Sequence, residues 1–83
     1  MNYQLTQHAK DVLLERRIPI EYVERILNAP ERFETDANDS ALEHRLGRIA
    51  EYGNRVLRVV VNPHDNPATV ITAFFDRKMR GKL

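Results

Sequence analysis

The spacing of apolar residues changes at Pro30, and this change limits the chain to folds that combine helices with a sheet. Before Pro30, apolar residues recur every three or four positions, which is the period of an amphipathic helix. After Pro30 they alternate with polar residues, which is the period of a strand. We therefore predict an α+β domain in the order ααββββ, with two helices on one face of a four-stranded, mainly antiparallel sheet.

Capping residues and prolines set the ends of the two predicted helices. Thr6 is a predicted N-cap for a helix from Gln7 to about Arg17. Pro19 ends that helix, because the residue before a proline disfavours helical backbone, and Pro19 also suits the start of the next helix. We expect the second helix over Ile20–Leu27, and Pro30 prevents it from continuing.

Turn-forming residues separate the four predicted strands. The separators are a polar loop at 36–40, the dipeptide Gly53-Asn54 and a proline-bounded turn at 63–67. Gly53-Asn54 indicates a two-residue hairpin, which places Tyr52 opposite Arg55. The expected strands are Arg32–Thr35, Leu42–Tyr52, Arg55–Asn62 and Ala68–Phe75.

The pairing implied by these turns assigns each strand residue to one face of the sheet. The face predicted to pack on the helices contains Leu46, Ala50, Leu57, Val59, Val61, Ile71, Ala73 and Phe75. The opposite face contains Arg45, Ile49, Val56, Arg58, Val60, Val70, Thr72 and Phe74, with Arg58 directly opposite Thr72. That second face is apolar around the Arg58–Thr72 pair, which predicts an interface or a binding surface.

One conflict remains in this assignment, because it places His44 and Arg48 on the face that packs on the helices. A β-bulge at Gly47 would move one end of that strand to the other face. The sequence does not decide between these two arrangements, and His44 stays a secondary candidate for a functional role.

Length and composition exclude several classes of protein. At 83 residues and 9.7 kDa, the chain is expected to form one domain over 1–83, ending in a short basic tail at 77–83. It has no cysteine, which excludes disulfide scaffolds and zinc fingers. Its three histidines lack metal-ligand spacing, so we expect no metal site and no cofactor. There is no targeting or membrane-spanning segment, so we predict a cytoplasmic protein that does not enter the membrane.

Charge is distributed unevenly along the chain, although the formal net charge is only +1. Residues 1–43 carry five basic and nine acidic side chains, whereas residues 44–83 carry eight basic and three acidic ones. This asymmetry indicates a side that faces a polyanion, or else two halves that neutralise each other in the folded chain. The predicted nucleic-acid-binding residues are Arg45, Arg48, Arg77, Lys78 and Arg80.

Several short motifs together resemble a known group of bacterial domains. They are Leu5-Thr6-Gln7-His8-Ala9, Arg16-Arg17-Ile18-Pro19, the segment Tyr22–Pro30, Val56–Val61 and Val70–Asp76. The chain resembles an uncharacterised family of small bacterial domains that looks related to BrnT-like and RelE-like toxins, whose fold is shared with barnase, EndoU and colicin ribonucleases. This resemblance implies a RelE-like fold and functional roles for His8, Arg16 and Thr72. It also implies RNA as a substrate and an antitoxin protein as a partner.

The candidate site has the residue types that metal-independent RNA cleavage requires. Such cleavage needs an acid or base that titrates near neutrality and cations that stabilise the phosphorane charge. His8 suits the first role, and Arg16 and Arg58 suit the second, with Thr72 as a hydrogen-bonding partner. Each residue also has a purely structural interpretation: His8 as a capping or solvent-facing residue, Arg16 as a helix C-terminal cation, and Arg58 with Thr72 as a cross-strand contact.

Three classes of function therefore remain open from the sequence. The first is a toxin-like, metal-independent ribonuclease, which requires His8 and a cationic cluster to meet in one cleft. The second is a non-catalytic nucleic-acid- or protein-binding module, which requires a positive surface without that convergence. The third is a homodimer that buries the apolar sheet face between two copies.

Overall fold

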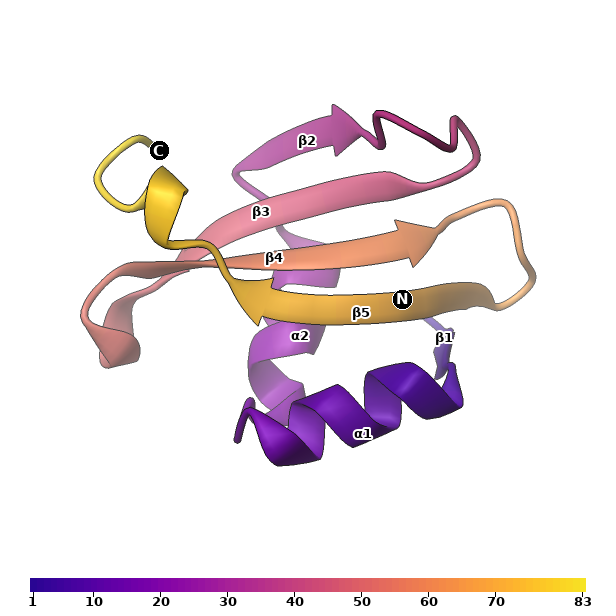
Figure 1. The fold of residues 1–83 in the computed structure, drawn as a ribbon, viewed down its shortest axis with the longest axis horizontal. Coiled ribbons are helices and arrows are strands. Elements are labelled where there is room, and N and C mark those ends of the chain that lie inside the picture. The colour runs from indigo at the N-terminus through magenta and orange to yellow at the C-terminus, as the bar shows by residue number, and fades with distance from the viewer.

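Two helices pack against one face of a five-stranded mixed sheet in the computed structural model, which describes residues 1–83 (Figure 1). The helices are α1 (Gln7–Glu15) and α2 (Ile20–Asn28). The strands are β1 (Tyr3–Leu5), β2 (Arg32–Thr35), β3 (Glu43–Ile49), β4 (Arg55–Asn62) and β5 (Ala68–Phe75). Two short 3-10 helices are η1 (Ala50–Tyr52) and η2 (Arg77–Met79). The predicted α+β class and its two helices are confirmed.

The strand order across the sheet is β1-β5-β4-β3-β2, and the β1–β5 pairing is the only parallel one. The prediction of four antiparallel strands is therefore wrong by one strand. Strand β1 has three residues, too few to show an alternating pattern, and its partner β5 lies near the other end of the chain. Its pairing depends on a long-range contact that the local sequence does not indicate.

Local capping explains the helix boundaries. The Thr6 side chain accepts a hydrogen bond from the backbone N–H of Ala9 at 3.0 Å, as its predicted N-cap role requires. Helix α1 ends at Glu15, before the predicted Arg17, because Arg17 has left-handed backbone with φ 55°. Helix α2 begins at Ile20 after Pro19, as predicted, and extends one residue past the predicted Leu27.

The predicted pairing of β3 with β4 is wrong, because the connection is longer than a two-residue hairpin. Helix η1 precedes Gly53 and Asn54, which both have positive φ, so Ile49 rather than Tyr52 pairs with Arg55. This shift of an odd number of residues moves every β3 side chain to the other face of the sheet. Ile49 therefore packs against the helices, and His44 and Leu46 lie on the opposite face.

The β3–β4 pairing is continuous from Glu43 to Ile49, so no bulge at Gly47 is needed to place His44 and Arg48 away from the helices. The predicted positions of Arg45 and Ala50 also change. Arg45 lies on the helix-covered face, opposite Val59, and Ala50 lies in η1.

A bulge between β4 and β5 corrects a second part of the predicted register. Arg58 pairs with Phe74 and Val60 pairs with Thr72, so the predicted Arg58–Thr72 pair is wrong. The register shifts by one residue between Val60 and Val61, which leaves Ile71 unpaired. As a result Val70, rather than Ile71, packs toward the helices.

One hydrophobic core lies between the helices and the sheet. Its buried members are Ala9, Leu13, Ile18, Val23, Ile26, Leu27, Ile49, Leu57, Val59, Val61, Ala68, Val70 and Ala73. The predicted burial of Leu57, Val59, Val61 and Ala73 is confirmed, whereas Ile71 is half-buried. Burial of apolar area on this scale is the main favourable term that holds the fold together.

The opposite sheet face is not the exposed apolar surface that the predicted register implies. Leu46, Val56 and Val60 lie on that face and are buried within the single chain. Helix η2 packs on β4 there, after the chain turns back at the end of β5 (Figure 1). No helix in the structure is both long enough and apolar enough to cross a bilayer.

We expect Gly47→Ala to destabilise the chain by about 1–3 kcal/mol through overpacking. A Cβ atom at Gly47 would lie 2.6 Å from Cδ1 of Ile26, the residue by which α2 packs on β3. Chemical denaturation of the single and double variants measures the effect. Ile26→Val removes Cδ1, so it should lower the free energy of unfolding less in the Gly47→Ala background than in the wild type. Additive effects of the two substitutions would contradict this contact.

Candidate functional site

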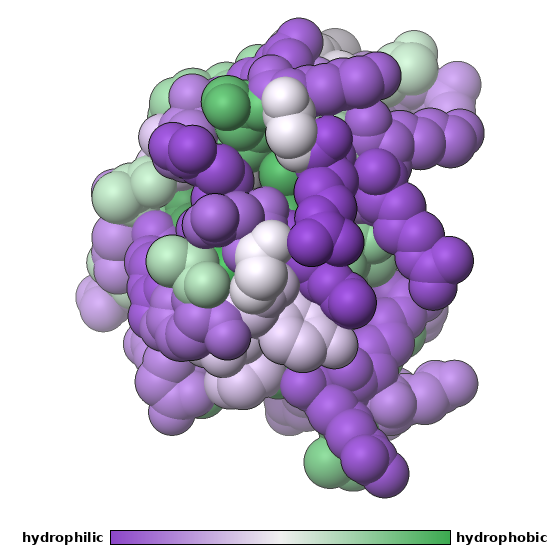
Figure 2. Space-filling view, turned by 90° about the vertical axis from the view of Figure 1, so that its left-hand side faces the viewer, coloured by the Kyte–Doolittle hydropathy of each residue, from purple (hydrophilic) through white to green (hydrophobic).

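Two adjoining hollows form a groove at the end of the molecule where α1 and β5 end. Their volumes are ≈ 600 Å³ and ≈ 340 Å³, and Arg16 and Phe75 line both of them. The remaining lining residues come from four segments of the chain and are Arg17, Ile18, Pro19, Tyr22, Tyr52, Arg55, Phe74, Arg77 and Arg80. We call this surface the arginine groove. Figure 2 views this end of the molecule, where hydrophilic side chains surround smaller apolar surfaces.

The fold brings these segments together because several chain connections meet at one end of the sheet. The turn after α1 supplies Arg16 and Arg17, and the start of β4 supplies Arg55. The segment after β5 turns back and supplies Arg77 and Arg80. The groove is therefore a property of the tertiary structure and is not built from any single motif.

Contacts with backbone and aromatic rings hold three of the arginines in place. Arg16 Nη1 donates to the carbonyl oxygen of Ala73 at 2.8 Å, on the part of β5 that extends beyond β1. The Arg55 guanidinium carbon lies 4.5 Å from the centroid of the Tyr52 ring. Arg80 Nη2 donates to the carbonyl oxygen of Gly53 at 3.3 Å.

Two aromatic rings form part of the wall next to these cations. The Tyr52 and Phe75 ring centroids are 4.9 Å apart and tilted by 49°. Tyr52 is 45% exposed, and its ring also contacts the Arg55 guanidinium. Rings of this kind, beside cations, are the usual stacking platforms for unpaired bases.

The ion pairs of the structure separate the ten arginines into two sets of five. Arginines that pair with a carboxylate all lie outside the groove and are Arg25, Arg32, Arg45, Arg48 and Arg58. Arginines without a carboxylate partner all line the groove and are Arg16, Arg17, Arg55, Arg77 and Arg80. No acidic side chain lines the groove, so these five positive charges are not neutralised locally.

The residues predicted to bind nucleic acid divide between these two sets. Arg77 and Arg80 line the groove. Arg45 is engaged by Glu43 at 2.8 Å and by the Leu27 carbonyl oxygen at 2.9 Å, and Arg48 is engaged by Glu31 at 2.7 Å. Lys78 is exposed beside the groove in η2.

Arg58 lies at the centre of an ionic cluster on the sheet face away from the helices. Its side chain is 11% exposed, and it contacts Glu34 at 2.8 Å and Asp76 at 2.9 Å. His44 Nδ1 accepts from Arg58 Nη1 at 2.9 Å, while His44 Nε2 lies 2.7 Å from Asp36. A guanidinium can only donate, so Nδ1 is the accepting nitrogen, and Nε2 is the nitrogen that faces the Asp36 carboxylate.

These contacts stabilise the charged forms of several carboxyl groups. The hydrogen bond from Arg58 lowers the pKa of Glu34, and the hydrogen bond from His44 lowers the pKa of Asp36. Two hydrogen bonds from Arg25 lower the pKa of Glu51 to about 2. Burial opposes the charge on Arg58, yet hydrogen bonds to Glu34 and Asp76 leave its pKa raised.

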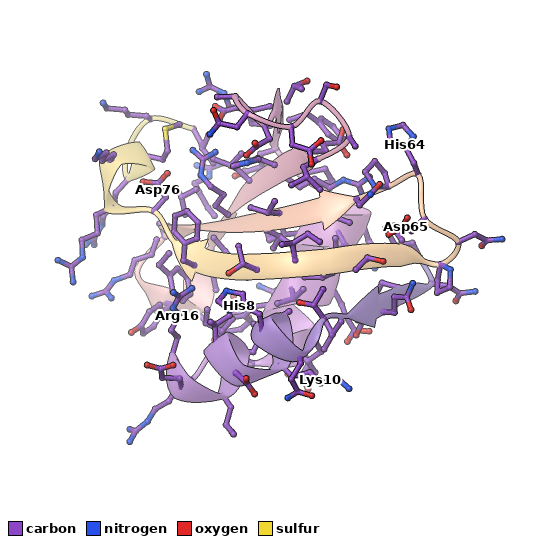
Figure 3. The ribbon with its side chains drawn as sticks, turned by 45° about the vertical axis from the view of Figure 1, so that its right-hand side comes forward. His8, Lys10, Arg16, His64, Asp65 and Asp76 are labelled. Carbon is purple, nitrogen blue, oxygen red and sulfur yellow. The ribbon has the colours of Figure 1, made fainter.

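The structure does not bring the four predicted catalytic residues together. His8 on α1 and Arg16, the residue directly after α1, both point toward β5 (Figure 3), but His8 is exposed and does not line the groove. Arg58 and Thr72 lie on the sheet face away from the helices. His64 is far from this site, in the turn at the opposite end of β5 from Asp76 (Figure 3).

Sequence reasoning missed Arg17, Arg55, Tyr22 and Tyr52 as groove residues. Arg17 and Arg55 flank turn residues, which is a weak signal that they lie at the end of an element. No local pattern indicates that these two turns meet at the same end of the sheet. The structure contains no group of three or more side chains that could hold a metal ion.

Most of the groove lies within a segment that identifies the family of the chain. Residues 5–75 match the DUF4258 family, described as a domain of unknown function, and the chain belongs to that family. The match ends before Arg77 and Arg80. Comparisons with curated proteins and with solved structures find no match. The resemblance to RelE-like toxins stays a prediction.

We expect the free energy of unfolding to decrease as the pH falls from about 4.5 toward 2. Carboxyl groups with a lowered pKa in the folded chain bind fewer protons than in the unfolded chain, so they stabilise the fold above their ordinary pKa and lose that effect on acidification. Urea denaturation across this range measures the decrease. Glu34→Gln removes one such group, so the free energy of unfolding of this variant should depend less steeply on pH. A wild-type stability that does not change with pH would contradict the expectation.

Proposed function

We propose that this chain binds single-stranded RNA through the arginine groove. The observation that carries the proposal is the separation of the arginines: all five that lack a carboxylate partner line one groove. Arginine is permanently charged and can contact a phosphate with two parallel donors. A surface that gathers five such side chains suits a ligand with several phosphates.

The aromatic side chains favour a single strand over a duplex. Tyr22, Tyr52, Phe74 and Phe75 line the same groove as the cations. Bases in a single strand can stack on such rings, whereas bases in a duplex are already stacked on each other. Phosphate contacts would then supply affinity, and stacking would supply the preference for unpaired RNA.

We expect Arg55→Ala and Arg77→Ala each to weaken RNA binding by roughly tenfold, because each removes one charged hydrogen-bond donor to phosphate. Arg48→Ala is the matched control, since Arg48 is also exposed but is paired with Glu31. Fluorescence anisotropy with a labelled RNA of about 12 unpaired nucleotides measures these affinities.

Salt dependence of the same titration gives a second readout. Each groove arginine removed should lower the slope of log affinity against log salt by about 0.7, the value for one phosphate contact on a single strand. Equal affinity for an RNA duplex, or equal losses in the Arg48→Ala control, would contradict the proposal. Tighter binding to single-stranded DNA than to RNA would mean that the ligand is single-stranded DNA.

Cleavage of bound RNA is a second proposal, supported by the position of His8. His8 and Arg16 lie about 80° apart around α1 and about 12 Å apart along its axis, so an RNA strand could reach both by running along the helix. Because His8 lies outside the groove, we place binding ahead of cleavage. A toxin-like ribonuclease with an antitoxin partner, as the family resemblance implies, belongs to this second proposal.

We expect His8→Ala to lower the rate of RNA cleavage by about 10²–10⁴-fold if His8 supplies acid–base catalysis. Gel analysis of RNA incubated with the purified chain measures the rate, and EDTA should leave it unchanged. RNA that stays intact, or cleavage that His8→Ala does not alter, would overturn catalysis and leave binding standing. Induced expression in bacteria tests toxicity, which His8→Ala should abolish.

A further inference from the structure

The segment after Asp76 that carries Arg77 and Arg80 forms the C-terminal wall of the arginine groove. We propose that Arg58 is a positioning residue that fixes this wall through Asp76. This inference rests on the proposed function for its consequence, because the wall carries Arg77 and Arg80. The position of the segment after β5, by contrast, can be tested without RNA. Arg58 itself is 11% exposed and fully engaged, which distinguishes its role from that of the groove arginines.

Asp76 connects the sheet to the first residues of the wall. It follows β5 directly, and its backbone N–H donates to the Val56 carbonyl oxygen at 2.8 Å. Its Oδ2 accepts from Arg58 Nε at 3.0 Å and lies 2.9 Å from Nη2 in the ion pair. Its Oδ1 accepts from the backbone N–H of Lys78 at 3.0 Å, which caps η2. One carboxylate therefore joins the centre of the sheet to the start of η2.

The other side of the Arg58 guanidinium is fixed by two neighbouring strands. Nη1 donates to Glu34 on β2 at 2.8 Å and to His44 on β3 at 2.9 Å. His44 is held in turn by Asp36 at 2.7 Å. All three guanidinium nitrogens are thus engaged. The contacts with Glu34 and His44 therefore fix the orientation of the guanidinium group that holds Asp76.

The wall needs this connection because its arginines are repelled by the other arginines of the groove. Arg77 and Arg80 share the groove with Arg16 and Arg55, and like charges repel at short range. Apart from the Arg58–Asp76 pair, the wall is tied to the rest of the chain by the backbone hydrogen bond from Asp76 to Val56 at its start and by the exposed 3.3 Å hydrogen bond from Arg80 to Gly53. Without the Arg58–Asp76 pair, the segment should open locally while the core stays folded.

Arg58 also neutralises Asp76, which is the acidic residue adjoining the wall. An unpaired carboxylate at that position would repel phosphate and reduce the positive potential of the groove. Figure 3 shows Asp76 at the end of β5, on the side that carries η2. The pair therefore has two effects, the placement of Arg77 and Arg80 and the removal of a competing negative charge.

Limited trypsin digestion tests the structural part, because the wall contains cleavage sites at Arg77, Lys78 and Arg80. Mass spectrometry follows loss of the C-terminal fragment from the folded chain. We expect Asp76→Asn and Arg58→Lys to speed this cleavage by at least about tenfold, since both weaken the Arg58–Asp76 ion pair. Arg58→Lys keeps the positive charge but removes the planar guanidinium group and its several donors. Arg48→Met, which breaks an ion pair on the same sheet face, is the matched control and should leave the rate unchanged.

Circular dichroism confirms that each variant still unfolds cooperatively, and Asp76→Asn serves if Arg58→Lys does not fold. RNA affinity of Asp76→Asn should fall despite the loss of a negative charge, and Arg77→Ala with Arg80→Ala should add little further loss in that background. Wild-type protection of the wall in folded Asp76→Asn would overturn the inference, as would a loosened wall with unchanged RNA affinity. If the wild type binds no RNA, the proposed function fails, and faster cleavage in Asp76→Asn still supports the positioning of the wall.

Discussion

The unequal pairing of arginines with carboxylates determines which surface of this chain can attract an anion. Glutamates from the first half of the chain engage four arginines of the sheet, as Glu31 engages Arg48 and Glu34 engages Arg58. The two halves therefore neutralise each other over most of the sheet. The arginines that remain unpaired gather at one end, although the formal net charge is only +1.

Much of the fold could be predicted from the sequence because the relevant signals are local. The bounds of β2, β4 and β5 follow from alternation between turn residues, and the start of α1 follows from the Thr6 cap. The faces of β3 could not be predicted, because η1 lengthens the turn before Gly53 and Asn54. A single misjudged turn reverses every side chain of a strand, since the strand period is two.

The candidate site was harder to predict because ion pairing is a property of the tertiary structure. Arg16 and Arg58 look alike in the sequence, yet one lines a groove and the other lies in a part-buried ionic cluster. The partners of Arg58 are 18 and 24 residues away, on other elements. Arg55 gave only the weak signal of a residue beside a turn, because its role depends on the contact of its guanidinium with the Tyr52 ring at the end where α1 also terminates.

The arginine side-chain Nε–Hε signals in a nuclear magnetic resonance titration with single-stranded RNA test the central claim most directly. They report on each of the ten arginines in one experiment. The account predicts that RNA shifts the signals of the five groove arginines, Arg16, Arg17, Arg55, Arg77 and Arg80, and leaves those of the carboxylate-paired arginines in place. Shifts concentrated on Arg32, Arg45 and Arg48, or spread evenly over both sets, would contradict it.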